Sequence, residues 1–280
     1  MSNLSDNNSV PEVVRSFGEE WEAFDQSSVP EDELARMFDA YFSVFPWESV
    51  QPNAKGFDCG CGSGRWAALV APRVGELLCI DPSEKALAVA QRRLASFANC
   101  VFHCAGVEDM PIENNSMDFG YSIGVLHHIP DTSRGIAACA AKLKPGAPFA
   151  LYLYYAFDYR PAWFVAIWKA SDAVRRVVSR CPFWLKRAVS EPIAAFVYWP
   201  LARLALVMEK LGINARNFPL YNYRNKSLYS MRTDSLDRFG TRLEHRFRKE
   251  QIRDMMLAAG FVRIRFSERD PYWCASGIKG

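Results

Sequence analysis

The sequence predicts a doubly wound α/β fold, and three observations support this prediction. Expected strands alternate with expected helices from about residue 55 to residue 158, and the same pattern resumes after residue 245. A glycine-rich turn joins the first strand to the first helix of this series. Such alternation is typical of a mostly parallel sheet with helices on both faces. The chain has 280 residues, half of them hydrophobic, which suffices for one α/β domain with a sizeable insertion.

The periodicity divides the chain into four segments. Aromatic residues at helical spacing predict an N-terminal helical cap, and the strand–helix series follows it. After the fifth strand, a long segment rich in Trp and Arg interrupts the series; its first part looks helical and its second part, residues 213–245, looks irregular. We expect this segment to be a lid over the substrate. The segments are the cap at 1–50, the first part of the core at 51–158, the insertion at 159–245 and the end of the core at 246–280.

The charge of the chain is distributed unevenly. Residues 160–250 contain 18 Lys and Arg against 7 Asp and Glu, whereas the rest of the chain contains 16 against 24. A basic segment on an acidic body indicates an anionic partner such as a phosphorylated substrate, a lipid headgroup or nucleic acid. The competing interpretation is a solvated, Arg-rich helical surface.

Two features predict a cytoplasmic protein without a membrane-spanning helix. The N-terminus has no basic segment followed by an apolar run, and no uninterrupted apolar run reaches about 18 residues. The eight cysteines are scattered, and the pair Cys59 and Cys61 has no second pair at zinc spacing, so we expect free thiols and no metal site.

The strongest local signal is a loop with three glycines at alternate positions. Asp58, Gly60, Gly62 and Gly64 lie between an expected strand and an expected helix, where glycines let the backbone approach a ligand closely. The G-x-G-x-G spacing departs from the dinucleotide fingerprint. Asp81 ends the next strand, where an acid can bind ribose hydroxyls. The loop and this acid together predict a nucleoside ligand without a pyrophosphate.

The run from Asp58 to Pro130 resembles the class I S-adenosylmethionine-dependent methyltransferases. The resemblance also includes the sequence Leu-His-His-x-Pro-Asp after the fourth strand and Lys-Pro-Gly before the fifth. It implies a Rossmann-like, seven-stranded methyltransferase fold and S-adenosylmethionine as the cofactor. The chain departs from many relatives at Gly106, where they carry an acid that contacts the adenine; Glu108 or Asp109 is the expected substitute. The implied cofactor contacts are Asp58, Gly60, Gly62, Gly64, Asp81, Pro82, Val107, Glu108, Ser122 and Ile123.

Candidates for catalysis and acceptor binding follow in the later half of the chain. His127 and His128 are the candidate general bases because imidazole titrates near neutral pH; alternatively one of them packs or caps a loop. Arginine forks and tyrosine rings suit an anionic acceptor, and the alternative is that Asp234, Asp237 and Glu244 neutralise these arginines. The acceptor-binding candidates are Tyr154, Tyr229, Arg232, Arg238 and Arg242.

Four functions remain open from the sequence. The leading one is transfer of a methyl group to an O or N atom of a small anionic bacterial metabolite, such as a sugar, a sugar nucleotide or a natural-product intermediate. The second is methylation of a lipid-linked acceptor, with peripheral membrane contact through the Trp-rich insertion. RNA methylation ranks lower because no RNA-binding module is recognisable, so no nucleic-acid partner is expected. A binding module without catalysis ranks last, and a homodimer is left open.

Overall fold

The computed structural model describes residues 8–157 and 160–280, and these divide into two compact units. The core unit contains Met1–Asp25, Arg36–Ala156 and Leu243–Gly280, and the insertion unit contains Gln26–Ala35 and Phe157–Arg242. The sequence predicts that the insertion runs from 159 to 245, whereas this unit runs from Phe157 to Arg242. Residues 26–35, which include the start of a cap helix, also group with the insertion, and no sequence pattern indicated this.

In the described residues of the core unit, seven strands form one sheet in the order β3-β2-β1-β4-β5-β7-β6. Neighbouring strands from β3 to β5 are parallel, whereas β7 is antiparallel to both β5 and β6. The doubly wound fold class predicted from the alternation is therefore confirmed. The strands are β1 (Lys55–Cys59), β2 (Glu76–Asp81), β3 (Cys100–Cys104), β4 (Phe119–Ile123), β5 (Pro148–Tyr152), β6 (Phe261–Phe266) and β7 (Cys274–Lys279).

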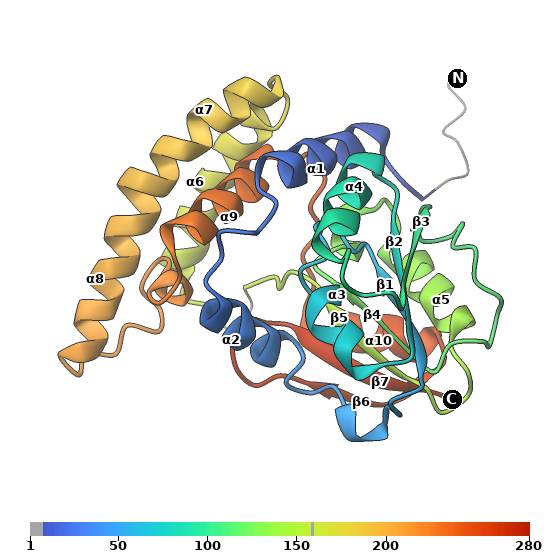
Figure 1. Cartoon of the computed structure of the whole chain (residues 1–280). Helices are drawn as coiled ribbons and strands as arrows, with labels where there is room; N and C mark the ends of the chain where they lie inside the picture. The colour runs from blue at the N-terminus through green and yellow to red at the C-terminus, as the bar shows by residue number, and fades with distance from the viewer. Residues whose placement is uncertain (1–7, 158–159) are drawn as a thin grey trace, which may run out of the picture. The chain divides into compact units, whose positions relative to one another are not determined.

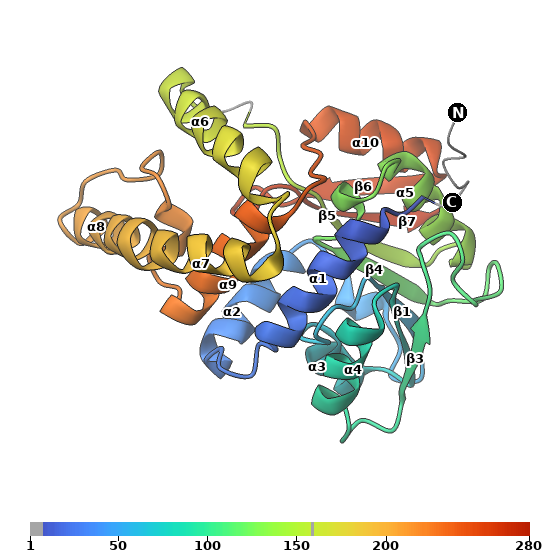
Figure 2. The ribbon, with the colours of Figure 1, turned by 90° about the horizontal axis from the view of Figure 1, so that it is seen from above.

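Helices cover both faces of this sheet (Figures 1 and 2). Figure 2 shows α3 and α4 on one side and α5 and α10 on the other. The cluster on the α5/α10 side joins side chains of these two helices to inward residues of β1, β2 and β5. The helices of the core unit are α1 (Pro11–Ala23), α3 (Ala67–Val70), α4 (Glu84–Arg93), α5 (Thr132–Lys142) and α10 (Lys249–Ala258); α2 (Glu31–Tyr41) begins in the insertion unit and ends in the core unit.

The centre of the sheet is packed by a reciprocal pairing of aromatic rings and glycines. Gly56 of β1 lies opposite Phe119 of β4, and Phe57 of β1 lies opposite Gly120 of β4. A methyl group on either glycine would collide with the ring of its partner, and both rings are fully buried. These glycines therefore give the two central strands the space to bury both rings, on opposite faces of the sheet.

The insertion unit is helical, and its most prominent element is one long helix. Residues 183–210 form a continuous helix in which a π-helical segment follows Pro192. Among the described residues, this helix alone is long and apolar enough to cross a membrane, as judged by length and composition, and 22% of its apolar window is buried. A search for uninterrupted apolar runs passes over this helix because charges interrupt its apolar stretch. The expectation that no helix spans a membrane stays a prediction. The elements are α6 (Ala162–Val178), α7 (Phe183–Ile193), the π-helix η4 (Ala194–Tyr198), α8 (Trp199–Lys210), the short 3₁₀ helix η5 (Tyr221–Tyr223) and α9 (Leu228–Gly240).

The helix α9 corrects the expectation that residues 213–245 are irregular. Small polar residues occupy much of its buried face, and they hide the hydrophobic periodicity on which the prediction rested. The Ser230 hydroxyl donates to Glu33 at 2.6 Å, and the Ser235 hydroxyl donates to the carbonyl of Ser190 at 3.0 Å. These hydrogen bonds satisfy the buried polar groups, so the helix can pack without an apolar stripe.

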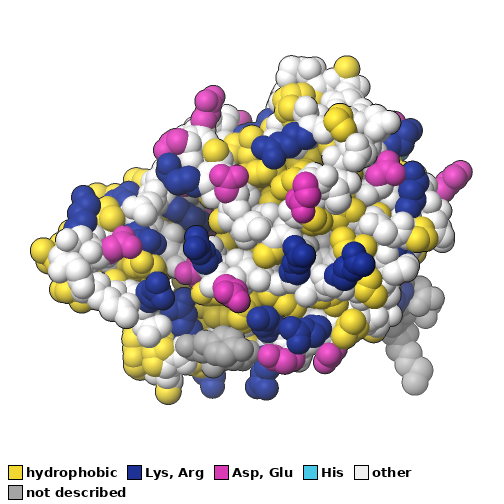
Figure 3. Space-filling view, turned by 90° about the horizontal axis from the view of Figure 1, so that it is seen from below, with side chains coloured by type: hydrophobic (Ala, Val, Ile, Leu, Met, Phe, Trp, Pro, Cys, Tyr) yellow, Lys and Arg dark blue, Asp and Glu magenta, His cyan; other side chains and the backbone are white. Residues whose placement is uncertain are grey.

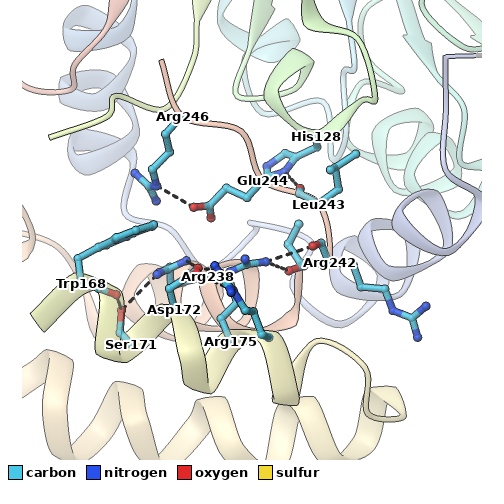
Figure 4. Close-up of polar contacts among 12 residues, drawn as sticks. His128, Trp168, Ser171, Asp172, Arg175, Arg238, Arg242, Leu243, Glu244 and Arg246 are labelled. Atoms are coloured by element: carbon cyan, nitrogen blue, oxygen red, sulfur yellow. Dashed lines mark hydrogen bonds and ion pairs between the residues drawn. The ribbon is translucent and has the colours of Figure 1, made fainter. Parts of the chain in front are cut away.

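A buried ionic network joins α6 to α9 within the insertion unit (Figure 4). Asp172 accepts from Arg175 Nε at 2.7 Å, and the Arg238 guanidinium lies 3.6 Å from the same carboxylate. Arg175 also donates to the carbonyl oxygens of Thr241 and Arg242. Burial raises the pKa of Asp172, but the hydrogen bond from Arg175 and the neighbouring arginine charges outweigh it and hold the pKa below its ordinary value.

Replacing Asp172 by Ala should destabilise the insertion unit by about 3–5 kcal/mol, because it leaves Arg175 buried without its carboxylate. The more exposed pair of Lys226 and Asp234 offers a control, and Asp234→Ala should cost less than about 1 kcal/mol. Urea unfolding of both variants measures the difference. In the wild type, the contribution of Asp172 should be complete above about pH 5 and disappear as the pH falls through its lowered pKa. Equal losses in the two variants would contradict this assignment.

Candidate cofactor and active site

The glycine-rich loop follows β1 and is bonded to the end of β2. Gly60, Gly62 and Gly64 have φ values of +81°, +53° and +74°, a conformation that side chains other than glycine adopt at a cost. The amides of Gly60 and Cys61 both donate to the carbonyl of Ile80, at 2.8 and 2.9 Å. The loop thus has one defined conformation, and its amides lie at the carboxyl edge of the sheet, where doubly wound folds bind ligands.

Asp81, the last residue of β2, is bonded to the loop and to the start of the next helix. Its Oδ2 accepts from the amide of Gly62 at 3.0 Å, and its Oδ1 accepts from the amide of Ser83 at 2.9 Å. Burial raises the pKa of Asp81 to about 6, although these two amides oppose the rise. An ionised carboxylate has about four acceptor positions, so two remain for the ribose hydroxyls of a nucleoside. The assignment of Asp81 to the ribose stays a prediction, and its geometry suits that role.

Polar groups without protein partners indicate that the loop is built for a polar ligand. Within the described parts of the chain, neither carboxylate oxygen of Asp58 nor the hydroxyl of Ser63 has a partner in hydrogen-bond geometry. Burial raises the pKa of Asp58 to about 8, an effect that the nearby Tyr121 hydroxyl partly offsets and the Asp81 charge reinforces. The cationic methionine part of S-adenosylmethionine would supply the missing donors. The residues therefore fit this cofactor: the loop for the methionine part and Asp81 for the ribose.

Trp21 of α1 is a candidate cofactor residue that the sequence analysis missed. A methyl group on Gly62 would lie 3.0 Å from its indole ring, and the Arg65 guanidinium lies 5.6 Å from the ring centroid. The ring therefore covers the loop at Gly62. In the sequence, Trp21 is one of several aromatic residues at helical spacing, and nothing there separates a residue that covers a loop from a core residue.

The remaining predicted cofactor residues lie at or shortly after the ends of β2, β3 and β4. They differ in the hydrogen bonds that they form within the protein. Glu108 forms an ion pair with Arg134, while its buried Oε1 lacks a hydrogen-bond partner among the described residues and could accept from an adenine amino group. Ser122 donates to the carbonyl of Cys59 at 2.9 Å and thereby joins β4 to β1. Pro82, Val107 and Ile123 make no hydrogen bond that defines a role, and their contacts to the cofactor stay predictions.

The two histidines after β4 differ in their surroundings. His127 is fully buried, stacks on Tyr154 with ring centroids 3.8 Å apart, and has no hydrogen-bond partner for either ring nitrogen in the described chain. Burial, helped by the charges of His128, Arg246 and His245, holds its pKa well below the ordinary value. His127 is therefore neutral at physiological pH, and this geometry favours a packing role.

His128 has the arrangement expected of a general base. Its Nδ1 lies 2.7 Å from the carbonyl oxygen of Leu243 (Figure 4), and a carbonyl can only accept, so Nδ1 carries the proton. In the neutral ring, Nε2 is then the atom that can take a proton. The centroid of the Phe17 ring lies 4.9 Å from that of the His128 ring, so this packing also restrains the imidazole. The assignment of His128 as a general base stays a prediction, and this tautomer suits it.

The predicted acceptor-binding residues all have internal partners in the structure. The Tyr154 ring lies against His127 and under the Arg246 guanidinium, at 5.0 Å. The Tyr229 hydroxyl accepts from the amide of Gln26 at 3.0 Å. Each of the three arginines has a partner other than the acids of the alternative interpretation. Arg232 binds Glu191 through two hydrogen bonds, Arg238 lies beside Asp172, and Arg242 donates to the carbonyl of Ser179. Their role in acceptor binding stays a prediction.

The raised pKa of Asp81 predicts how the affinity for the cofactor depends on pH. Ribose hydroxyls donate to the ionised carboxylate, so the affinity for S-adenosylhomocysteine should fall as the pH drops from 7 to 5 through the pKa of about 6. Asp81→Asn should bind at least tenfold more weakly at pH 7 and show no step in this interval. Titration calorimetry measures both constants. A wild-type affinity that is constant from pH 5 to 7 would contradict the assignment.

Comparison with known proteins shows which proteins the segment around this site resembles. Residues 57–151 match a family model described as a methyltransferase domain. The chain is 35% identical over 94 residues to a ubiquinone biosynthesis O-methyltransferase of Chromobacterium violaceum, a match that covers 33% of this chain and 40% of that protein. The chain thus spans less than half the length of this relative and of similar enzymes from other bacteria.

Two solved structures share the fold across most of the chain. A candidate methyltransferase of Bacillus halodurans has a TM-score of 0.51 at 14% identity and covers 84% of this chain and 72% of its own. The phosphoethanolamine N-methyltransferase 2 of Haemonchus contortus, in complex with S-adenosylmethionine, has a TM-score of 0.51 at 16% identity and covers 91% and 43%. Residues 57–151 therefore match the methyltransferase-domain model, and the chain has the fold of these methyltransferase structures.

Proposed function

We propose that the chain transfers a methyl group from S-adenosylmethionine to an oxygen or nitrogen atom of a small, anionic metabolite. The main support for this reaction is the hydrogen bond between Asp81 and the glycine loop, which lies inside the segment that matches the methyltransferase domain. The similarity to an O-methyltransferase supports a hydroxyl acceptor. The basic insertion, with 18 Lys and Arg against 7 acids over residues 160–250, supports the negative charge of the acceptor.

The residues on the core unit account for most of what such a reaction needs. The bound cofactor supplies a methyl group activated by a sulfonium. Asp81 and the loop amides orient the nucleoside, and Trp21 covers the loop and excludes water from it. His128, with Nδ1 held by the carbonyl of Leu243, accepts at Nε2 the proton that a hydroxyl acceptor loses. The neutral rings of His127 and Tyr154 pack beside this base.

A second candidate is methylation of a lipid-linked acceptor. The insertion exposes large hydrophobic side chains, among them Trp184 at 69% and Phe196 at 80% exposure. Such residues suit contact with a bilayer in which an acceptor is dissolved.

A glycine-to-alanine substitution in the loop tests cofactor binding. Gly62→Ala places a methyl group against Trp21 at a φ of +53°, so the affinity for S-adenosylhomocysteine should fall at least tenfold. Gly146→Ala is the matched control, because Gly146 also has a positive φ of +84° but nothing lies within 4 Å of the added methyl group. Calorimetry on both variants gives the comparison. Similar affinities for Gly62→Ala and Gly146→Ala would contradict the placement of the cofactor at this loop.

The charge of the acceptor can be tested with labelled cofactor. When the chain is incubated with methyl-tritiated S-adenosylmethionine and a bacterial small-molecule extract, the label should appear in the fraction that an anion exchanger retains. Label in the fraction extracted by organic solvent would instead support the lipid-linked acceptor. Label only in the unretained aqueous fraction would contradict both candidates.

The labelled fraction then tests the arginines. Arg232→Ala should raise the acceptor KM, because it removes a guanidinium that can bind the anion, while cofactor affinity stays within twofold. Glu191→Gln is the control, since it breaks the same ion pair but leaves the guanidinium in place. Arg238→Ala and Arg242→Ala complete the set. Wild-type kinetics in all three arginine variants would show that these residues do not bind the acceptor.

A further inference from the structure

The helix α6 exposes a continuous apolar stripe. Positions spaced by three and four residues fall on one side of a helix, and along α6 the exposed positions with this spacing are apolar. Trp163, Ile167, Val174 and Val177 are 47–67% exposed. The opposite side contains the buried network of Asp172 and Arg175. The stripe consists of Trp163, Ile167, Ala170, Val174 and Val177.

The long helix of residues 183–210 exposes a second apolar stripe. Its exposed apolar positions follow each other at steps of three or four residues over the whole length, from Trp184 at 69% exposure to Val207 at 50%. No charged residue interrupts this stripe. Leu211, just beyond the helix, is also apolar and is 70% exposed. The stripe consists of Trp184, Ala188, Pro192, Phe196, Pro200, Leu204 and Val207.

Basic residues flank these stripes, and the acids are neutralised. Lys169, Arg176 and Arg180 are exposed and lie in one row along an edge of the α6 stripe, and Arg176 also donates to Asp172 at 3.0 Å. The single acid of α6 is the buried Asp172, and the two acids of the long helix, Glu191 and Glu209, are paired with Arg232 and Arg224. Figure 3 shows hydrophobic and basic side chains mingled over the part of the surface on the left of the view. The chemistry of these helices therefore matches a surface that is apolar inside and negatively charged outside.

The inner side of the long helix excludes a spanning arrangement. Ser190, Ala194, Tyr198, Ala202 and Ala205 are buried, and α7 packs along α9. Arg203 donates to the carbonyl oxygens of Arg224 and Lys226 at 2.6 and 3.0 Å, and Glu191 accepts from Arg232. A helix that crossed a bilayer would have to break these polar contacts, each at the cost of an unpaired group in hydrocarbon. The helix can instead lie in the plane of the interface with its outer stripe in the acyl region.

We propose that the outer stripes of α6 and the long helix bind the surface of an anionic lipid bilayer, with the exposed Trp and Phe side chains inserted and the basic row on the headgroups. A second copy of the chain would be a poorer occupant. In a symmetric dimer the same patch faces itself, so the basic rows would oppose each other without acids to neutralise them. The inference concerns the insertion alone and rests on neither the reaction nor the acceptor.

Vesicle flotation with the full chain tests this inference. The chain should float with vesicles of phosphatidylcholine and phosphatidylglycerol in a ratio of 7:3, and it should bind pure phosphatidylcholine at least tenfold more weakly. The double variant Trp184→Ser with Phe196→Ser should lose at least tenfold in binding to the anionic vesicles, because both side chains are more than two-thirds exposed and contribute little to folding. The double variant Lys169→Glu with Arg180→Glu should lose at least as much, since basic residues are attracted to an anionic surface and acids are repelled by it.

Controls separate membrane binding from other causes. Leu257→Ser replaces an apolar residue of the core unit that is 52% exposed, and it should leave vesicle binding unchanged. All variants should keep the wild-type melting temperature and bind S-adenosylhomocysteine as the wild type does. Failure of the wild type to float with anionic vesicles would overturn the proposal. So would a wild-type dimer that Trp184→Ser with Phe196→Ser converts to a monomer, without any vesicle binding.

Discussion

The hydrogen bond from the amide of Gly62 to Oδ2 of Asp81 is the interaction on which the candidate site depends. It joins the loop after β1 to the end of β2, and the second oxygen of the same carboxylate joins the start of α4 through the amide of Ser83. The loop can bend toward Asp81 because Gly60, Gly62 and Gly64 all have positive φ values. A carboxylate buried this deeply is stabilised by the amides that it accepts from. The same groups that position a ligand therefore also fix the geometry of the loop.

The sequence is most informative where local rules and the tertiary fold agree. The alternation of strands and helices predicted the doubly wound sheet, and the glycine spacing with Asp81 pointed to one loop at one edge of it. The sequence fails where buried polar residues take the place of apolar ones. The buried face of α9 contains Ser230, Thr233 and Ser235, whose partners lie far away in the chain, so its helical period was invisible. The arginines also have distant partners. Glu191 is 41 residues before Arg232 in the sequence, and Asp172 is 66 residues before Arg238.

The insertion reverses the usual distribution of side chains between interior and surface. Asp172 and Arg175 lie in its interior, whereas Trp184 and Phe196 lie outside. Burying the ion pair costs desolvation energy that good geometry only offsets, so it is weak evidence for stability. Exposed aromatic side chains lower the solubility of a monomer, and a large exposed apolar patch usually marks a surface that binds a partner or a membrane. Both features make physical sense if the outer side of the insertion meets an apolar environment. The arginine network then determines how the helices that form this side are arranged.

The structure of the chain with bound S-adenosylhomocysteine tests the central claim most directly, namely that one carboxylate holds both the loop and the ribose. We expect both ribose hydroxyls within hydrogen-bond distance of Asp81, with the bond from Gly62 to Asp81 retained and the amino group of the ligand near Asp58. The indole of Trp21 should cover the loop as it does now. A ligand whose ribose lies away from Asp81, or a loop that abandons Asp81 on binding, would contradict this account.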